Sequence, residues 1–91
     1  MNNTYKGFSI SQIVTVKELI KCQYYDYPNK GDNNKILEPG ELAVIESIMP
    51  KVRINKPNTG EYFYNLIRLA SNKDTSIYPV MDYHNLVKLN S

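Results

Sequence analysis

Turn signals recur at short intervals along this chain and limit its apolar segments to the length of β-strands. The strongest is Pro39-Gly40, where proline presets the negative φ of the second residue of a type II turn and glycine supplies the positive φ of the third. An almost continuous apolar run follows at 42–45, and polar turns follow at 55–60 and 70–76. This spacing predicts several short strands joined by tight connections.

Two prolines and one aspartate predict where the pairing of these strands is interrupted. Because proline has no N–H to give to a sheet, Pro50 predicts an edge, a bulge or a bend, and Pro79 predicts an edge strand or a short pairing. The carboxylate of Asp82 can accept backbone N–H bonds, so we expect it to cap one helical turn at 83–85. A last short strand is then expected at 86–89.

The N-terminal third of the sequence fits more than one structure. Within 10–24, apolar residues fall near helical spacing, whereas the β-branched cluster at 13–16 favours a strand. We prefer the strand and keep the helix as the alternative. Residues 1–9 are polar and are expected to be loose. The segment 26–35 is rich in Pro, Gly, Asn and Asp, and it is expected to form a loop.

Composition excludes several classes of function. The chain has 91 residues, which fits one domain over 1–91. Cys22 is the only cysteine and His84 the only histidine, so an intramolecular disulfide, a cysteine-based metal site and a multi-histidine metal site are excluded. We therefore expect no metal, no cofactor and no enzymatic activity.

No apolar run approaches the roughly 18 residues of a membrane span, and no secretory signal is recognisable, which favours a cytoplasmic protein.

The expected elements are about five short strands with one helical turn before the last, which indicates an all-β protein built as a small barrel or sandwich. In this order the chain resembles the SH3-like barrel superfold over 11–89. The resemblance rests on PGELAVIESI at 39–48, on the hairpin around NKPNTG at 55–60 and on the turn before NLVKL at 85–89. It implies a single SH3-like barrel domain. Tryptophan and an ALYDY-like opening are absent from the sequence, so the resemblance does not extend to the conventional polyproline groove of eukaryotic SH3 domains.

Tyrosine is the residue type that most strongly suggests a function. The chain holds eight tyrosines, and tyrosine supplies rigid contact area with a polar tip at binding surfaces. Three of them crowd into 24–27 and cannot all face one core. We therefore predict a non-enzymatic binding module that contacts another protein. The expected contact residues are Tyr24, Tyr25, Tyr27, Tyr62 and Tyr64, with Arg53 and Arg68 as polar anchors.

The same residues allow other interpretations. A position at the rim of the core is the alternative for any single tyrosine. Lys51, Arg53, Lys56 and Arg68 beside tyrosines also suit single-stranded nucleic acid, as in a KOW-like barrel, although a net charge of +2 is too balanced to predict this by itself. A small-ligand trap or an enzyme ranks last. A phage or mobile-element inhibitor of a host defence system, resembling an anti-CRISPR protein, is one version of the protein binder, and the oligomeric state is open.

Overall fold

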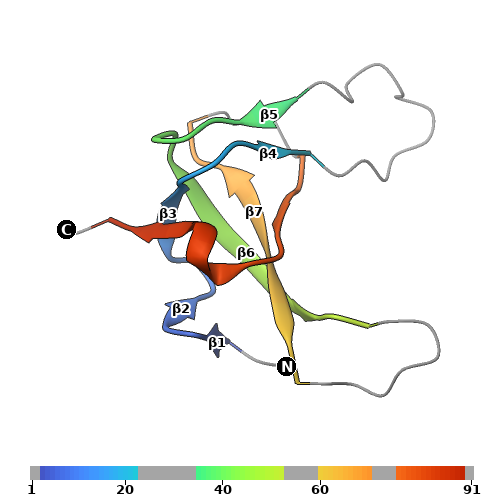
Figure 1. The fold of residues 1–91 in the computed structure, drawn as a ribbon. Coiled ribbons are helices and arrows are strands. Elements are labelled where there is room, and N and C mark those ends of the chain that lie inside the picture. Colours follow the sequence, from blue (N-terminus) through green and yellow to red (C-terminus); the bar gives the residue numbers. More distant parts are fainter. Residues whose placement is uncertain (1–2, 23–34, 53–59, 71–75, 90–91) are drawn as a thin grey trace.

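The computed structural model describes residues 3–22, 35–52, 60–70 and 76–89, and these residues form β-strands and one short 3-10 helix (Figure 1). The prediction of an all-β fold is therefore confirmed. The strands are β1 (Thr4–Tyr5), β2 (Phe8–Ser9), β3 (Ile13–Val16), β4 (Ile20–Lys21), β5 (Ile36–Leu37), β6 (Ala43–Pro50), β7 (Tyr62–Arg68), β8 (Tyr78–Val80) and β9 (Leu86–Lys88), and the helix is η2 (Tyr83–Asn85).

Five of the strands form one antiparallel sheet in the order β8-β7-β6-β3-β9. The strands β6, β7 and β8 are successive neighbours, whereas the chain after η2 crosses back so that β9 pairs with β3. Two small hairpins, β1–β2 and β4–β5, lie at opposite ends of the molecule in Figure 1, and β4 packs near β8. This curled sheet has a 3-10 turn before its last strand, as the sequence predicts.

The longest strand pair, β6 with β7, contains a β-bulge that changes which side of β6 faces the core. The register shifts between Ile45 and Ser47, so Glu46 is the extra residue on β6. Ile45 and Ile48 therefore both lie in the core, although alternation along an unbroken strand would put them on opposite faces. The pairing that we expected Pro50 to interrupt runs on to that residue, which pairs with Tyr62 as the last residue of β6.

Three other local predictions are confirmed. Gly40 has a φ of +87°, as the third residue of a type II turn requires. Pro79 lies on β8, which is an edge strand of the sheet. Asp82 caps η2 by accepting the backbone N–H of His84. Each of these residues constrains only its immediate neighbours, which is why the sequence was sufficient to predict them.

The N-terminal hairpin differs from the loose segment that we expected over 1–9. Its strands pair through Tyr5 and Phe8, and the two turn residues Lys6 and Gly7 have φ values of +53° and +83°. Two successive positive φ values are typical of a type I′ turn, whose twist suits a two-residue hairpin. Phe8 enters the core, and this burial fixes a segment whose polar composition suggested looseness.

The strand interpretation is correct for the part of 10–24 that the structure describes. β3 lies between β6 and β9 and β4 follows it, and 10–22 holds no helix. A central strand pairs its backbone on both sides, and the Val14 and Val16 side chains of β3 are buried. The residue spacing of this segment fits both a helix and a strand, and pairing with strands distant in sequence decides in favour of the strand.

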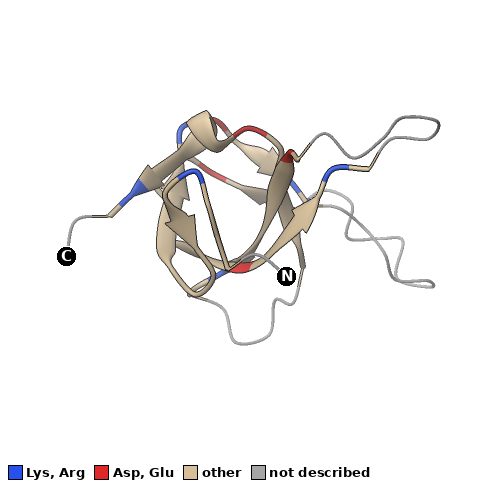
Figure 2. Cartoon of the chain, turned by 90° about the horizontal axis from the view of Figure 1, so that it is seen from below, with Lys and Arg blue, Asp and Glu red and all other residues tan. Residues whose placement is uncertain are grey.

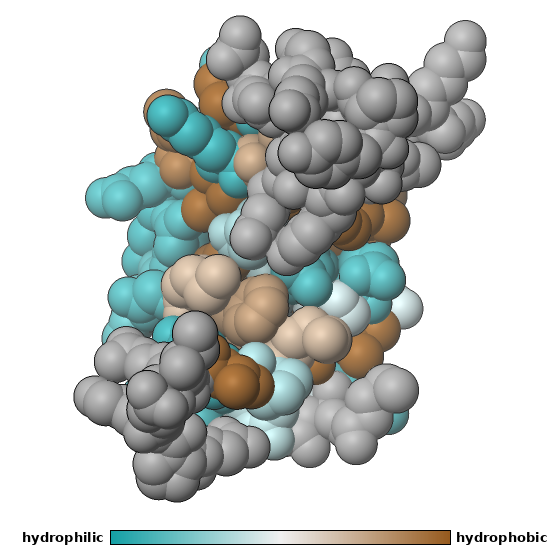
Figure 3. Space-filling model, turned by 90° about the vertical axis from the view of Figure 1, so that its right-hand side faces the viewer, coloured by the Kyte–Doolittle hydropathy of each residue, from teal (hydrophilic) through white to brown (hydrophobic). Residues whose placement is uncertain are grey.

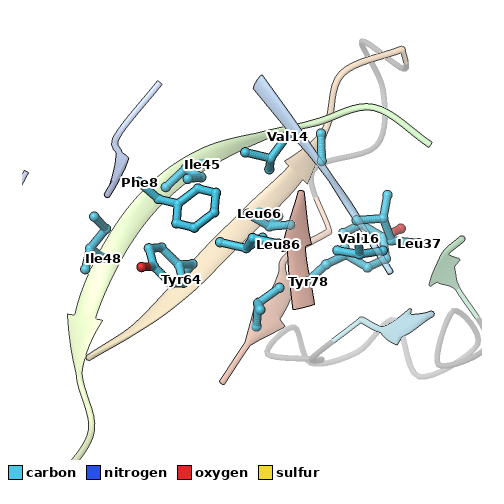
Figure 4. Close-up of a cluster of buried hydrophobic side chains, with 12 residues drawn as sticks. Phe8, Val14, Val16, Leu37, Ile45, Ile48, Tyr64, Leu66, Tyr78 and Leu86 are labelled. Atoms are coloured by element: carbon cyan, nitrogen blue, oxygen red, sulfur yellow. The ribbon is translucent and has the colours of Figure 1, made fainter. Parts of the chain in front are cut away.

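The core fills the inside of the curled sheet, where side chains from its strands point toward one another (Figure 4). Tyr64 and Tyr78 are its two largest members and are completely buried. They supply large aromatic side chains to the core of a chain that lacks tryptophan. The buried cluster consists of Phe8, Val14, Val16, Leu37, Ala43, Ile45, Ile48, Tyr64, Leu66, Tyr78, Val80 and Leu86.

Candidate functional site

An open groove of about 560 Å³ lies where three distant parts of the chain meet. Its walls are the β1–β2 hairpin, the adjoining ends of β6 and β7, and the turn that leads from β8 into η2. Each wall contributes one tyrosine, namely Tyr5, Tyr62 and Tyr83, and we therefore call it the tyrosine groove. All three side chains are half-buried and pack against the core, so each ring is both anchored and partly accessible.

Contacts among aromatic rings hold one wall of the tyrosine groove in place. The Tyr5 ring centre lies 5.2 Å from that of Tyr62 and 5.8 Å from that of the buried Tyr64. The Tyr64 hydroxyl donates a hydrogen bond to the backbone carbonyl of Tyr5. Burial, and to a smaller extent the neighbouring Tyr5 and Tyr83, raises the pKa of Tyr64 to about 12, so this hydroxyl keeps its proton. A wall tied to the core in this way loses little freedom when a partner binds.

The tyrosine groove also carries both signs of charge. Its charged residues are Lys6, Lys51, Glu61 and Asp82. The Lys6 ammonium lies 5.9 Å from the centre of the Tyr5 ring and 5.6 Å from that of the Tyr83 ring. Both distances fall within the roughly 6 Å over which a ring face attracts a cation. The exposed side chain of Met81 adds an apolar patch, so the groove offers aromatic, apolar and ionic contacts together.

Asp82 brings a carboxylate to the groove beside the start of η2. Its Oδ1 accepts the backbone N–H of His84 at 2.9 Å and lies 2.8 Å from His84 Nδ1. The backbone hydrogen bond lowers the pKa of Asp82 most, and the His84 side-chain bond and the charges of His84 and Lys51 lower it further. Asp82 is therefore ionised at neutral pH, and the groove keeps this negative charge.

Asn85 fixes the position of the third wall. Its Oδ1 accepts the backbone N–H groups of Lys17 and Glu18 at 3.1 and 2.8 Å, and its Nδ2 donates to the Glu18 carbonyl at 3.3 Å. These bonds tie η2 to the segment between β3 and β4. A smaller hollow of about 290 Å³ lies along this contact and shares Met81 and Asp82 with the tyrosine groove.

The predicted contact residues have different positions in the structure. Tyr62 lines the tyrosine groove. Tyr64 was predicted as a surface contact, but its side chain has 0% exposure. It lies on the side of β7 that faces the core. The other candidates lie outside the described residues, and these are Tyr24, Tyr25, Tyr27 and Arg53.

Arg68 lies at the opposite end of β7 from the tyrosine groove. Its guanidinium forms an ion pair with Glu41, with side-chain exposures of 22% and 30%, and donates a hydrogen bond to the Ile36 carbonyl. It also lies 5.4 Å from the centre of the buried Tyr78 ring. The residue that we expected to anchor a partner is thus engaged within the protein itself.

Sequence reasoning missed Tyr5 and Tyr83 as members of one site. They lie near opposite ends of the chain, and they come together only because the β1–β2 hairpin and η2 pack around the start of β7. The predicted cap at Asp82 is the one signal that could have pointed to Tyr83, because it locates the helical turn that carries this ring.

Other parts of the surface are mixed in character. Lys and Arg positions are interspersed with Asp and Glu around the barrel (Figure 2). Figure 3 shows one face where hydrophobic residues, coloured tan to brown, gather beside hydrophilic ones. Apolar side chains such as Ile13, Leu42, Met49 and Leu69 are 41 to 45% exposed. Apolar exposure at this level is common in small proteins and does not by itself define a site.

Neither a membrane helix nor a metal site occurs in the part of the chain that the structure describes. No helix there is long and apolar enough to cross a bilayer, and no group of three or more His, Cys, Asp or Glu side chains there could hold a metal ion. Comparison with protein-family models, with curated proteins and with solved structures finds no significant match to this chain. The tyrosine groove is therefore the basis on which we propose a function.

Proposed function

We propose that this protein is a small, non-enzymatic binding module that contacts another protein through the tyrosine groove. One observation carries the proposal: three half-buried tyrosines from distant segments converge on one open groove. Tyrosine is enriched at binding hot spots because it buries a large area with few rotatable bonds. The attachment of Tyr5 to the core through Tyr64 supports this function, since a preorganised wall lowers the entropy cost of association.

The charges of the groove favour a protein partner over nucleic acid. Two lysines are balanced there by two carboxylates, whereas binding to a phosphate backbone depends on an excess of basic groups. A gel-shift assay with single-stranded DNA and RNA at several salt concentrations tests this choice. We expect no salt-sensitive binding, and a steep loss of affinity with salt would instead favour the nucleic-acid-binding barrel.

Some of the proposed contact residues rest on the sequence alone. Tyr24, Tyr25, Tyr27 and Arg53 remain proposed contact residues on the grounds given by the sequence. We also propose a cytoplasmic location, which the single cysteine supports. An inhibitor of a host defence system, encoded by a phage or mobile element, is one version of this binder, and the small size of the domain is its only support.

The experiment that tests the function compares a variant of the groove with a control variant at a neighbouring position on β7. The double variant Tyr62→Ala with Tyr83→Ala removes two of the three groove rings. Phe63→Ala is the control, because Phe63 follows Tyr62 on β7, is also half-buried and has the opposite parity on the strand. Each protein is used for affinity purification from the native host, and captured proteins are identified and then purified for direct binding measurements.

The expected result is a partner that binds the wild-type protein and the Phe63→Ala variant but loses at least tenfold affinity for the double variant. Hot-spot tyrosines typically contribute about 2 kcal/mol or more, which corresponds to a loss of this size. Circular dichroism of all three proteins checks that the fold is retained. A partner that binds the folded double variant as tightly as the wild type would rule out the tyrosine groove as the binding site.

A further inference from the structure

Lys6 stands out in the tyrosine groove because its ammonium lies near two aromatic rings. It is 5.9 Å from the centre of the Tyr5 ring and 5.6 Å from that of Tyr83. A ring face attracts a cation at roughly these distances. The Lys6 residue is exposed, so burial does not hold its ammonium in this place, and another cation can take its position.

The backbone at Lys6 supports a role for this side chain. Its φ of +53° lies in the left-handed region, and Gly7 follows at +83°. Asn, Asp or Gly is the usual first residue of a type I′ turn, because other residues are strained there. Turn chemistry therefore does not account for a lysine at this position. The placement of its ammonium over the two groove rings does account for it.

Two carboxylates complete a site that suits a cation. Glu61 and Asp82 line the same groove as the rings, and Lys51 is the other lysine there. With Lys6 in place, the two lysines balance the two carboxylates. When the Lys6 ammonium moves out, two carboxylates face one lysine, and the groove carries a net negative charge. The electrostatics then favour a positively charged replacement.

We propose that the tyrosine groove binds a lysine or arginine side chain of the partner protein, and that Lys6 occupies the same place in the free protein. This inference rests on the proposed function and names the chemistry of its ligand. The Tyr5 and Tyr83 rings provide cation–π contacts, and the carboxylates of Glu61 and Asp82 provide the opposite charge. Binding displaces the Lys6 ammonium into solvent, so Lys6 competes with the partner.

A series of short peptides tests the preference for a cation. Capped pentapeptides with arginine, lysine, glutamine or glutamate between two pairs of glycines are titrated into the isotope-labelled full chain and followed by NMR. We expect the arginine and lysine peptides to shift the amide signals of Tyr62 and Tyr83, and the glutamine and glutamate peptides to leave them unchanged. Equal shifts with the arginine and glutamine peptides would overturn the inference.

Substitutions at Lys6 and Tyr83 test the competition directly. Lys6→Asn removes the internal cation and keeps a residue that a type I′ turn favours, so we expect it to tighten arginine-peptide binding by about two- to fivefold. Tyr83→Leu is expected to weaken binding by about the same factor, whereas Tyr83→Phe retains the ring and the affinity. Unchanged or weaker binding by a folded Lys6→Asn variant would contradict the competition.

The failure of this inference differs from the failure of the proposed function. If the purified partner depends on Tyr62 and Tyr83 but the peptides show no preference for a cation, the inference is wrong and the function stands. If the partner binds independently of both tyrosines, the proposed function is wrong, and the inference falls with it. If the partner depends on the tyrosines and on one of its own basic residues, both are supported.

Discussion

The two ends of β7 differ in whether their side chains are open to the surface or engaged within the protein. Tyr62 starts the strand at the open tyrosine groove, and Arg68 finishes it in a closed polar contact. Both belong to the inward parity of the strand, with the buried Tyr64 and Leu66 between them. At the closed end, Glu41 and the Ile36 carbonyl already bind the guanidinium. At the open end, rings and charges face a groove that a partner can enter.

This contrast shows that residue type alone does not decide whether a side chain is available for binding. Arg68 looked like a surface anchor in the sequence, yet its partners belong to the fold. Lys6 is an exposed residue whose ammonium lies near two half-buried rings. The closed end of β7 is therefore expected to affect stability, and the open end to affect binding. Three comparisons of variants test this division, from the largest expected effect to the smallest.

Replacing Tyr64 by alanine should have the largest effect on stability. The side chain is fully buried, and truncating a large buried aromatic residue typically costs about 3–5 kcal/mol in the free energy of unfolding. Tyr62→Ala removes a half-buried ring of the same parity and should cost about 1 kcal/mol. Urea denaturation of both variants provides the measurement. Equal losses would mean that the open end of β7 is as much a part of the core as its centre.

Replacing Arg68 by methionine should have an intermediate effect. The change removes an ion pair and a hydrogen bond that are only partly exposed. A hydrogen bond to a charged group contributes about 1.5–3 kcal/mol to stability. We expect a loss of about 1–3 kcal/mol, against about 0.5 kcal/mol or less for Lys51→Met in the groove. A double-mutant cycle of Arg68→Met with Glu41→Gln isolates the pair, and zero coupling would contradict the closed contact.

Asp82 should give the smallest effect, a difference in Tm that depends on pH. Its folded-state pKa is lowered from the ordinary 3.8, so its stabilising contribution is present above that value and is lost as the pH falls through the folded-state pKa. The Tm of the wild type should therefore exceed that of Asp82→Asn at neutral pH, and the gap should close in acid. Asparagine retains a helix-capping side chain, so the comparison reports the charge.

A second variant separates the causes of this shift. His84→Gln removes the ring partner of Asp82 but leaves the backbone N–H that lowers its pKa most. We expect most of the pH dependence to survive in His84→Gln. If His84→Gln abolishes the dependence as completely as Asp82→Asn does, the side-chain pair rather than the cap controls the titration.

Much of the fold could be predicted because its signals are local. The positive φ at Gly40, the cap at Asp82 and the edge strand at Pro79 follow from what each residue does to its neighbours. The bulge at Glu46 could not be predicted, because it depends on how two strands match along their length. The hairpin at Lys6 could not be predicted either, because lysine is not a usual residue for its turn.

The candidate site was predicted only at Tyr62 among the three groove tyrosines. The sequence pattern of β7 places large groups on both faces, and nothing local tells which face is inside. The structure resolves this by burying Tyr64 and leaving Tyr62 at the end of the same row. Tyr5 and Tyr83 join it from segments that the sequence does not connect.

The sequence by itself determined the all-β class, the turns around Gly40 and Asp82 and the absence of paired cysteines. These follow from backbone constraints and composition, which act within a few residues or over the whole chain. Only the tertiary structure decided that Tyr64 belongs to the core while Tyr5, Tyr62 and Tyr83 meet at one groove. Burial and convergence depend on which surfaces pack together, and that packing joins residues far apart in the chain.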